Sequence, residues 1–210
     1  MGLPKPLLEG HWRFRRNVYA RDRGRYQQLA ELGQSPTAMV VACCDARVDV
    51  SLIFDAKPGD LFILRNVANL VPPYEPEGKY HGTSAAIEFA VQGLKIPNLI
   101  VLGHSRCGGV AAYRQKVREN VSKAGFIGQW LTLLDNLKLE EADISARGDE
   151  TAFELAAIRA SIANLRTFPF VVEREKAGLL ALHGLHFDIG SGELLSLDER
   201  TGRFEPLPES

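Results

Sequence analysis

Short apolar runs alternate with amphipathic segments along the first half of the chain. Uninterrupted apolar runs predict buried strands at residues 37–42, 60–64 and 98–103. Apolar residues at helical spacing predict a helix over residues 24–32 and another from residue 83 or 84 to residue 93. A further helix is expected to begin at Gly108. Because strands and helices alternate, this pattern predicts a mostly parallel sheet.

The second half combines a helical region with short late strands. Residues 124–166 have a helical composition, and strands are predicted at residues 179–189, 193–197 and 203–207. We find no internal repeat and no linker. We therefore expect one α/β domain over residues 1–210, with a mostly parallel central sheet flanked by helices and a late antiparallel hairpin. Residues 1–33 are expected to form a helical arm at its N-terminal end.

The composition narrows the class of protein without naming a function. The chain has 210 residues, a net charge of −1 and a hydrophobic fraction of 45%, which gives no sign of a nucleic-acid partner. No apolar run approaches the roughly 20 residues that span a bilayer, and the N-terminal residues lack a signal-peptide pattern. The three cysteines do not suggest a disulfide framework. We expect a cytoplasmic protein without a membrane partner.

Metal-binding side chains follow two of the predicted strands. Cys43 comes directly after the strand at residues 37–42, and His104 and Cys107 follow the strand at residues 98–103. Open α/β sheets bind ligands at the carboxyl ends of their strands, so the three side chains should meet there. Three protein ligands of this kind leave a fourth tetrahedral position on zinc open, which is typical of a catalytic site. We expect one Zn²⁺ ion per chain.

A carboxylate and a guanidinium accompany the first of these ligands. Asp45 lies two residues after Cys43, so both side chains point the same way if the strand is still extended there. Arg47 repeats the spacing and is expected to hold Asp45 in a forked ion pair that keeps it ionised and oriented. Such an acceptor matters because two thiolates leave zinc formally neutral, so that the metal acidifies bound water less strongly.

Other readings of the same residues stay open. A closed structural zinc site needs a fourth ligand, for which the candidates are His11, His81, His183, His186 and Cys44. We expect Cys44 to pack as a small apolar residue, His81 to be a capping or surface residue, and the two late histidines to be structural. A hydrolase with Ser105 as nucleophile is a rival, because residues 103–107 nearly match the Gly-x-Ser-x-Gly elbow. A Cys107 nucleophile with His104 as base is another.

These motifs together resemble those of the β-class carbonic anhydrases. The family pattern Cys-x-Asp-x-Arg is met at residues 43–47, and the pattern His-x-x-Cys-Gly is met at residues 104–108. The similarity extends from about residue 34 to residue 110. The resemblance implies that zinc-bound hydroxide attacks CO2 to form bicarbonate and a proton, with Asp45 and Arg47 as the catalytic pair. It leaves open hydrolysis of CS2 or COS on the same fold.

The resemblance also implies the residues that surround the substrate. Gln34 holds the position, nine residues before the first cysteine ligand, of a substrate-binding Gln in the plant-like branch. Phe62 and Val67 match apolar positions that line the CO2 pocket, and Gly108 matches a position where the backbone approaches the bound anion. Phe89 replaces a Tyr of that branch that is implicated in proton relay. Family members build this pocket at a dimer interface, so a homodimer or a multiple of dimers is implied.

One departure concerns access to the metal. The bicarbonate-inhibited branch of the family carries a Trp three residues before its first cysteine ligand, whereas this chain has Val40. We therefore expect a site open to water at neutral pH, in which Asp45 does not become the fourth zinc ligand.

Overall fold

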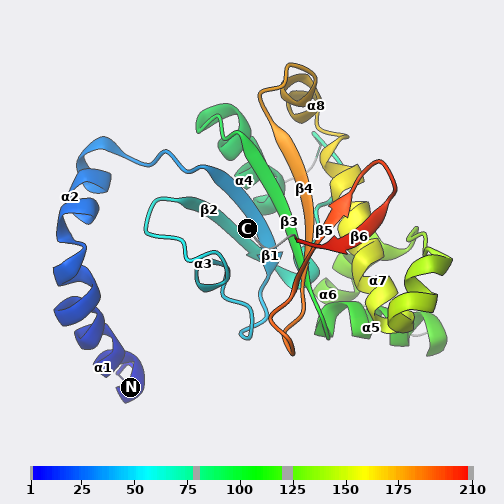
Figure 1. The fold of residues 1–210 in the computed structure, drawn as a ribbon, viewed down its shortest axis with the longest axis horizontal. Helices are drawn as coiled ribbons and strands as arrows, with labels where there is room; N and C mark the ends of the chain where they lie inside the picture. Colours follow the sequence, from blue (N-terminus) through cyan, green and yellow to red (C-terminus); the bar gives the residue numbers. More distant parts are fainter. Residues whose placement is uncertain (1, 78–80, 120–124, 208–210) are drawn as a thin grey trace.

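A computed structural model describes residues 2–77, 81–119 and 125–207 of the chain. At its centre lies a six-stranded sheet in the order β2-β1-β3-β4-β5-β6 (Figure 1). The first four strands run parallel and the last two are antiparallel. The strands are β1 (Ala38–Cys43), β2 (Leu61–Asn66), β3 (Asn98–His104), β4 (Ala181–Phe187), β5 (Leu194–Asp198) and β6 (Arg203–Pro206). The predicted α/β fold is confirmed.

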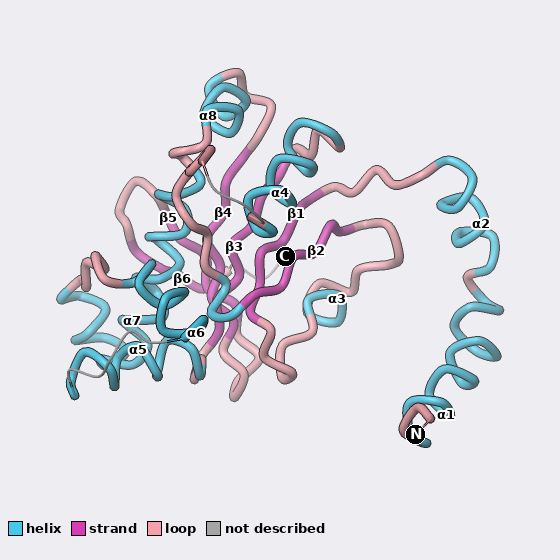
Figure 2. Tube along the Cα trace, turned by 180° about the vertical axis from the view of Figure 1, so that it is seen from behind, coloured by secondary structure: helices cyan, strands magenta, loops and turns pink. Residues whose placement is uncertain are grey.

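Helices cover the two faces of this sheet unequally. The short α3 (Val50–Ile53) lies against one face, and α4 (Gly82–Glu88), α7 (Glu141–Leu165) and α8 (Pro169–Lys176) pack on the other. The helix predicted over residues 83–93 begins at Gly82 and ends in a π-helical turn, Phe89–Gly93. The region predicted as helical divides into α6 (Gly125–Trp130), a 3-10 turn (Leu131–Leu134) and α7, while α5 (Gly108–Glu119) follows β3 as expected. Figure 2 shows this arrangement from behind.

The N-terminal residues form a helical arm that extends away from the sheet (Figures 1 and 2). It consists of α1 (Lys5–Phe14), a π-helical turn (Arg15–Tyr19) and α2 (Arg23–Leu32), and none of these contains a buried residue. Arg25 attaches α2 to the body, since its guanidinium donates to the Pro58 carbonyl over 2.6 Å and pairs with the Asp60 carboxylate. The arm therefore exposes apolar surface that the body of this chain does not cover.

The core follows from the alternation of side chains along each buried strand. Met39 and Val41 of β1 face α7, whereas Val40 and Ala42 face the side of α3, and all four are completely buried. Because both faces of β1 are covered, its sequence is an uninterrupted apolar run. In the described ranges no single helix is long and apolar enough to cross a membrane, although α7 and α8, bent at 88°, meet that test together by length and composition.

Two glycines allow α7 to approach the sheet closely. A Cβ added at Gly103 in β3 would lie 2.6 Å from Ile158 Cδ1, and one added at Gly184 in β4 would lie 2.9 Å from Ile158 Cγ2. Ile158 is completely buried in the core between them. Any side chain at either glycine would therefore push α7 outwards, together with the residues that this helix presents to the end of β3.

We predict that Gly103→Ala destabilises the protein by about 1–3 kcal/mol, because the added methyl group overpacks a rigid core. Urea unfolding followed by circular dichroism measures the change. Gly108→Ala is the matched control, since a Cβ at that position meets no atom within 4 Å. In an Ile158→Ala background the cost of Gly103→Ala should shrink. Equal stability of the two glycine variants would contradict this packing.

Candidate active site

Three ligand atoms meet where β1 and β3 end. Cys43 is the last residue of β1, His104 is the last residue of β3, and Cys107 lies just before α5. Their sulfur and nitrogen ligand atoms all lie within 4.8 Å of one another, and all three residues are buried. Because β1 and β3 are parallel neighbours, their carboxyl ends reach the same edge of the sheet. The three predicted ligands are thus brought together by the topology.

The donor atoms of this group fit a zinc ion. The two sulfur atoms lie 4.0 Å apart, close to the separation of about 3.8 Å that tetrahedral Zn–S bonds of 2.3 Å require. The Nδ1 atom of His104 lies 2.9 Å from the Ser105 carbonyl oxygen, to which it donates. The other ring nitrogen, Nε2, is buried without a hydrogen-bond partner among the described residues. A buried imidazole nitrogen without a hydrogen-bond partner, close to two thiols, is typical of a zinc site.

The surroundings of the two thiols favour their ionisation one after the other. A hydrogen bond from the Cys107 thiol lowers the pKa of Cys43 to about 4. The same contact raises the pKa of Cys107, although backbone N–H groups at the start of α5 act in the opposite direction. One thiolate is therefore already stabilised by the protein, and binding of a divalent cation would release the proton of the second.

Asp45 and Arg47 form the forked ion pair that the sequence predicts. Arg47 donates from Nε to Asp45 Oδ1 over 2.9 Å and from Nη2 to Oδ2 over 2.7 Å. These bonds hold the pKa of the Asp45 carboxyl below its usual range. The same Nη2 donates to the Arg106 carbonyl over 2.9 Å, so Arg47 joins the loop after β1 to the loop after β3. Asp45 Oδ2 lies 3.9 Å from His104 Nε2, beside the metal-binding group.

The backbone that carries Asp45 differs from the expected extended strand. β1 ends at Cys43, and a turn closed by the bond from Val48 N–H to the Asp45 carbonyl follows it. Arg65, which the sequence analysis did not single out, fixes this turn. Its Nε donates to the Cys43 carbonyl over 2.9 Å and its Nη2 to the Asp45 carbonyl over 2.7 Å. Its signal in the sequence is its place directly after the second predicted strand, at the start of residues 65–69, which resemble the exit of that strand in the β-class carbonic anhydrases.

Val67 and Gly108 lie beside the metal-binding group. Val67 Cγ1 approaches Gly109 so closely that an added Cβ there would lie at 2.9 Å. Trp130 holds the Val67 carbonyl through a hydrogen bond of 2.8 Å from its Nε1. A Cβ at Gly108 would meet no described atom within 4 Å, so space for a ligand lies next to its backbone. Both residues thus lie close to the loop that carries Cys107, and their contact with substrate stays a prediction.

Gln34, Phe62 and Phe89 lie away from this chain's own metal-binding group. Gln34 precedes β1, whose extended span from Ala38 to Cys43 is about 17 Å. Phe62 pairs with Met39 in the first half of the strand, and its ring centroid lies 5.8 Å from that of Phe89. Phe89 is 51% exposed. Gln34 and Phe62 therefore lie towards the amino ends of the strands, with Phe89 beside Phe62, whereas Cys43 lies at the carboxyl end of β1.

One cavity opens next to the predicted site. It has a volume of about 680 Å³ and is lined by Cys44, Val67 and His81, together with apolar residues of α6 that include Trp130. The prediction that Cys44 packs as a small apolar residue is wrong, because the residue is exposed. Cys44 follows the end of β1 and lines this cavity, where its side chain is accessible. His81 lies exposed at the start of α4, as predicted for a surface or capping residue.

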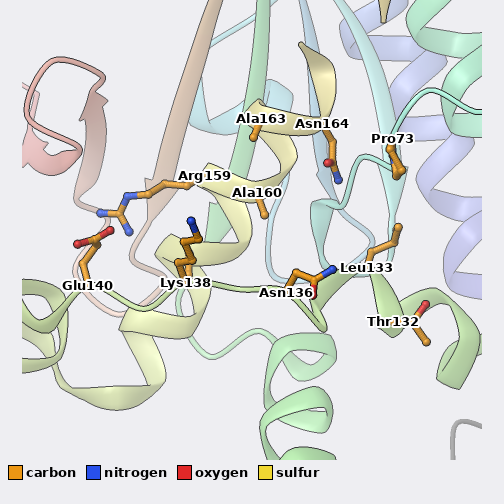
Figure 3. A pocket seen from close by; sticks show the side chains of 11 residues that line it. Pro73, Thr132, Leu133, Asn136, Lys138, Glu140, Arg159, Ala160, Ala163 and Asn164 are labelled. Carbon is orange, nitrogen blue, oxygen red and sulfur yellow. The ribbon is translucent and has the colours of Figure 1, made fainter. Parts of the chain in front are cut away.

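A second cavity, of about 520 Å³, lies over α7 (Figure 3). Its wall includes Lys138, Arg159 and Asn164, and it contains none of the predicted site residues. Arg159 is already engaged there, since it pairs with Asp143 over 2.7 Å and donates to the Gly202 carbonyl. The residues that line this cavity are therefore distinct from those of the metal-binding group.

The rival readings find little support in the geometry. None of the five candidate fourth ligands joins the metal-binding group within the described part of the chain. The Ser105 hydroxyl accepts a hydrogen bond from the Ile189 N–H over 2.9 Å and is buried, and the neighbouring His104 ring contacts the Ser105 carbonyl instead of its hydroxyl. A serine nucleophile would need a histidine base on that hydroxyl, and neither ring nitrogen of His104 is placed there.

We predict that the purified chain binds one zinc ion, and that Cys107→Ser and His104→Ala lose most of it because each removes one of three ligands. Metal analysis after gel filtration measures the zinc content. Cys44→Ser is the matched control, since this exposed thiol lies outside the ligand group. Loss of zinc in the control, or its retention in both ligand variants, would contradict the assignment.

Comparison with known proteins agrees with this geometry. The carbonic anhydrase family profile matches residues 38–194. The chain is 35% identical to β carbonic anhydrase 3 of Arabidopsis thaliana over 203 residues, which cover 93% of this chain and 78% of the plant protein.

Solved structures show the same similarity. The structure of the β-carbonic anhydrase CcaA matches with a TM-score of 0.82 and 33% identity, over 98% of this chain and 92% of that one. One of two tetrameric β-carbonic anhydrases from Sordaria macrospora matches with a TM-score of 0.77 and 28% identity, over 91% of this chain and 95% of that one. The profile, the relatives and the Cys-His-Cys group agree that the chain belongs to the β-class carbonic anhydrases, zinc-binding lyases that interconvert CO2 and bicarbonate.

Proposed function

We propose that this carbonic anhydrase is of the plant-like branch, with a metal site that stays open to water at neutral pH and a substrate pocket completed by a second copy of the chain. The observation that carries the open site is the pairing of Asp45 with Arg47 through two hydrogen bonds of 2.9 and 2.7 Å. An Asp45 carboxylate held in this way is not free to turn and ligate the metal.

Cys43, His104 and Cys107 would hold the zinc ion. Zinc bound there supplies the Lewis acidity that activates water towards CO2. Asp45 is ionised and acceptor-only, so it can take a hydrogen bond from the reacting water and orient it. Arg47 keeps this carboxylate charged and aimed, and it touches the reaction only through Asp45. Val67 supplies an apolar wall that suits an uncharged substrate, and the open space at Gly108 accommodates the product anion.

Val40 supports the open state. It is completely buried and packs with Ala42 and Leu102 on the side of the sheet that α3 covers. A Trp, which the bicarbonate-inhibited branch has here, would not fit this volume without rearrangement. The spacing of Gln34 from Cys43 and the 35% identity to a plant enzyme also favour the plant-like branch. CS2 or COS as substrate would use the same groups, and CO2 turnover by the chain separates these alternatives.

A second copy is the natural source of the missing part of the pocket. Gln34, Phe62 and Phe89 lie towards the amino ends of the strands, away from Cys43. The strand β2 is an edge strand, in which Ile63 is exposed, and Phe89 is exposed beside it. In a two-fold dimer the same surface serves both copies, so each could offer these residues to its partner. The arm of α1 and α2 adds exposed Leu7, Leu8 and Trp12, which would clasp that partner. Reduced thiols at the metal site fit the cytoplasm as the proposed location.

We predict that the wild-type enzyme hydrates CO2 at neutral pH and that Arg47→Leu lowers kcat/KM there by ~10²-fold. Without the guanidinium the pKa of Asp45 rises towards its ordinary value, and the freed carboxylate competes with water for the metal. Activity should recover as the pH rises, because hydroxide then competes better with the carboxylate. Stopped-flow CO2 hydration across the pH range measures this.

Arg47→Lys is the matched control for that experiment. It keeps the positive charge but cannot make the fork, so its loss at neutral pH should lie between wild type and Arg47→Leu. A wild-type enzyme that is inactive at neutral pH and active only in alkali would refute the open site. Absence of CO2 hydration at every pH with zinc bound would move the assignment to a CS2-type substrate.

We predict that two impaired variants complement each other. Cys107→Ser removes the metal site, and a Gln34→Ala, Phe89→Ala double variant removes the groups assigned to the partner. In a mixed dimer one site has both its metal ligands and its partner's residues intact, so remixing equal amounts should restore about a quarter of wild-type activity. The control is the same equal mixture of the two variants, assayed without allowing their subunits to exchange. Activity no higher than the mean of the two separate variants would refute a shared pocket.

A further inference from the structure

A buried carboxylate and a buried histidine lie behind the metal ligand Cys107. Glu154 of α7 is 3% exposed and His186 of β4 is 2% exposed. One Glu154 oxygen, Oε1, accepts a hydrogen bond of 3.0 Å from the backbone N–H of Cys107, and the other, Oε2, lies 3.0 Å from His186 Nε2. Neither residue belongs to the metal-binding group. Burying an ionisable pair is costly unless it is hydrogen-bonded, so its position next to a ligand calls for a role.

The carboxylate completes the start of α5. Cys107 is the N-terminal cap of this helix, because its carbonyl accepts the first helical hydrogen bond, from Ala111 N–H over 2.9 Å. In many helices a Glu or Gln three residues after the cap accepts a hydrogen bond from the cap's own N–H. Here that position is Val110, which has no acceptor. Glu154, from a helix far along the chain, takes its place and ties the ligand to α7.

His186 in turn fixes Glu154. Because a carboxylate oxygen accepts, the hydrogen of this contact lies on His186 Nε2. The other ring nitrogen, Nδ1, has no hydrogen-bond partner among the described residues, so Glu154 is the one polar group that the structure shows on this ring. Gly184 lies two residues before His186 and leaves room for Ile158, one helical turn after Glu154. The close packing of α7 on the sheet therefore sets the distance between the two side chains.

We propose that Glu154 and His186 act as a positioning pair that holds Cys107 in its metal-binding orientation and thereby sets the affinity of the site for zinc. Neither residue touches substrate, and both act through the backbone of Cys107. The inference rests on Cys107 as a metal ligand, which the zinc content of the wild-type chain tests separately. Groups that orient metal ligands typically contribute 10–100-fold to metal affinity.

The test compares variants of the full chain by two readouts other than activity. Zinc affinity is measured by competition with a chromophoric chelator, and the coordination geometry by the visible spectrum of the cobalt-substituted protein. Glu154→Leu removes the acceptor, whereas Glu154→Gln keeps a carbonyl oxygen of the same reach. Ile162→Ala is the matched control, since this buried residue of α7 faces the core cluster and lies outside the contacts of Cys107.

We expect Glu154→Leu to weaken zinc binding by about 10–100-fold and to change the cobalt spectrum, while Glu154→Gln recovers much of the affinity. Ile162→Ala should lose thermal stability but keep both readouts. If Glu154→Leu does not fold, His186→Leu, which leaves Glu154 without its anchor, is expected to weaken zinc binding in the same direction. The proposal would be overturned if Glu154→Leu and His186→Leu bound zinc as tightly as Ile162→Ala does. It would also be overturned if Glu154→Gln recovered none of the zinc affinity lost in Glu154→Leu.

Discussion

The hydrogen bonds of Arg47 join the two halves of the active site. Its guanidinium binds both oxygens of Asp45, which lies in the turn after β1, and also the carbonyl of Arg106, which lies between the ligands His104 and Cys107. A rigid, planar guanidinium can satisfy all of these acceptors at once. As a result, the pKa of the Asp45 carboxyl lies below its usual range, and Asp45 Oδ2 is held 3.9 Å from His104 Nε2. The openness to water that we propose for the site depends on this one side chain.

The sheet makes that arrangement possible, because parallel neighbouring strands end at a common edge. Arg65 of β2 then holds the carbonyls of Cys43 and Asp45, and Glu154 of α7 holds the N–H of Cys107. Each ligand loop is thus supported by an element outside it. The close approach of α7, which Gly103 and Gly184 permit, connects this support to the core. Packing and coordination are therefore coupled at Ile158, so that a side chain added at Gly103 or Gly184 is expected to displace α7 and with it Glu154.

Much of the fold and the metal-binding group could be predicted from sequence, because the signals were local. Apolar runs marked β1, β2 and β3, and soft ligands directly after two of them placed the site at the carboxyl edge. The spacing of two between Asp45 and Arg47 sufficed for their pairing, although a turn, not a strand, produces it. Arg65 and Glu154 were missed because their contacts span 20 to 47 positions along the chain. Cys44 was misplaced because alternation was extended past the end of β1.

The roles of Gln34, Phe62 and Phe89 could not follow from spacing within one chain, because the roles that we propose for them depend on a neighbouring copy. The metal coordination at neutral pH is the most direct test of the open site. A crystal structure of the zinc-loaded protein near neutral pH should show zinc bound by Cys43, His104 and Cys107 with a water-derived fourth ligand, and Asp45 still paired with Arg47. A carboxylate oxygen of Asp45 on the zinc, with the Arg47 pair broken, would contradict it.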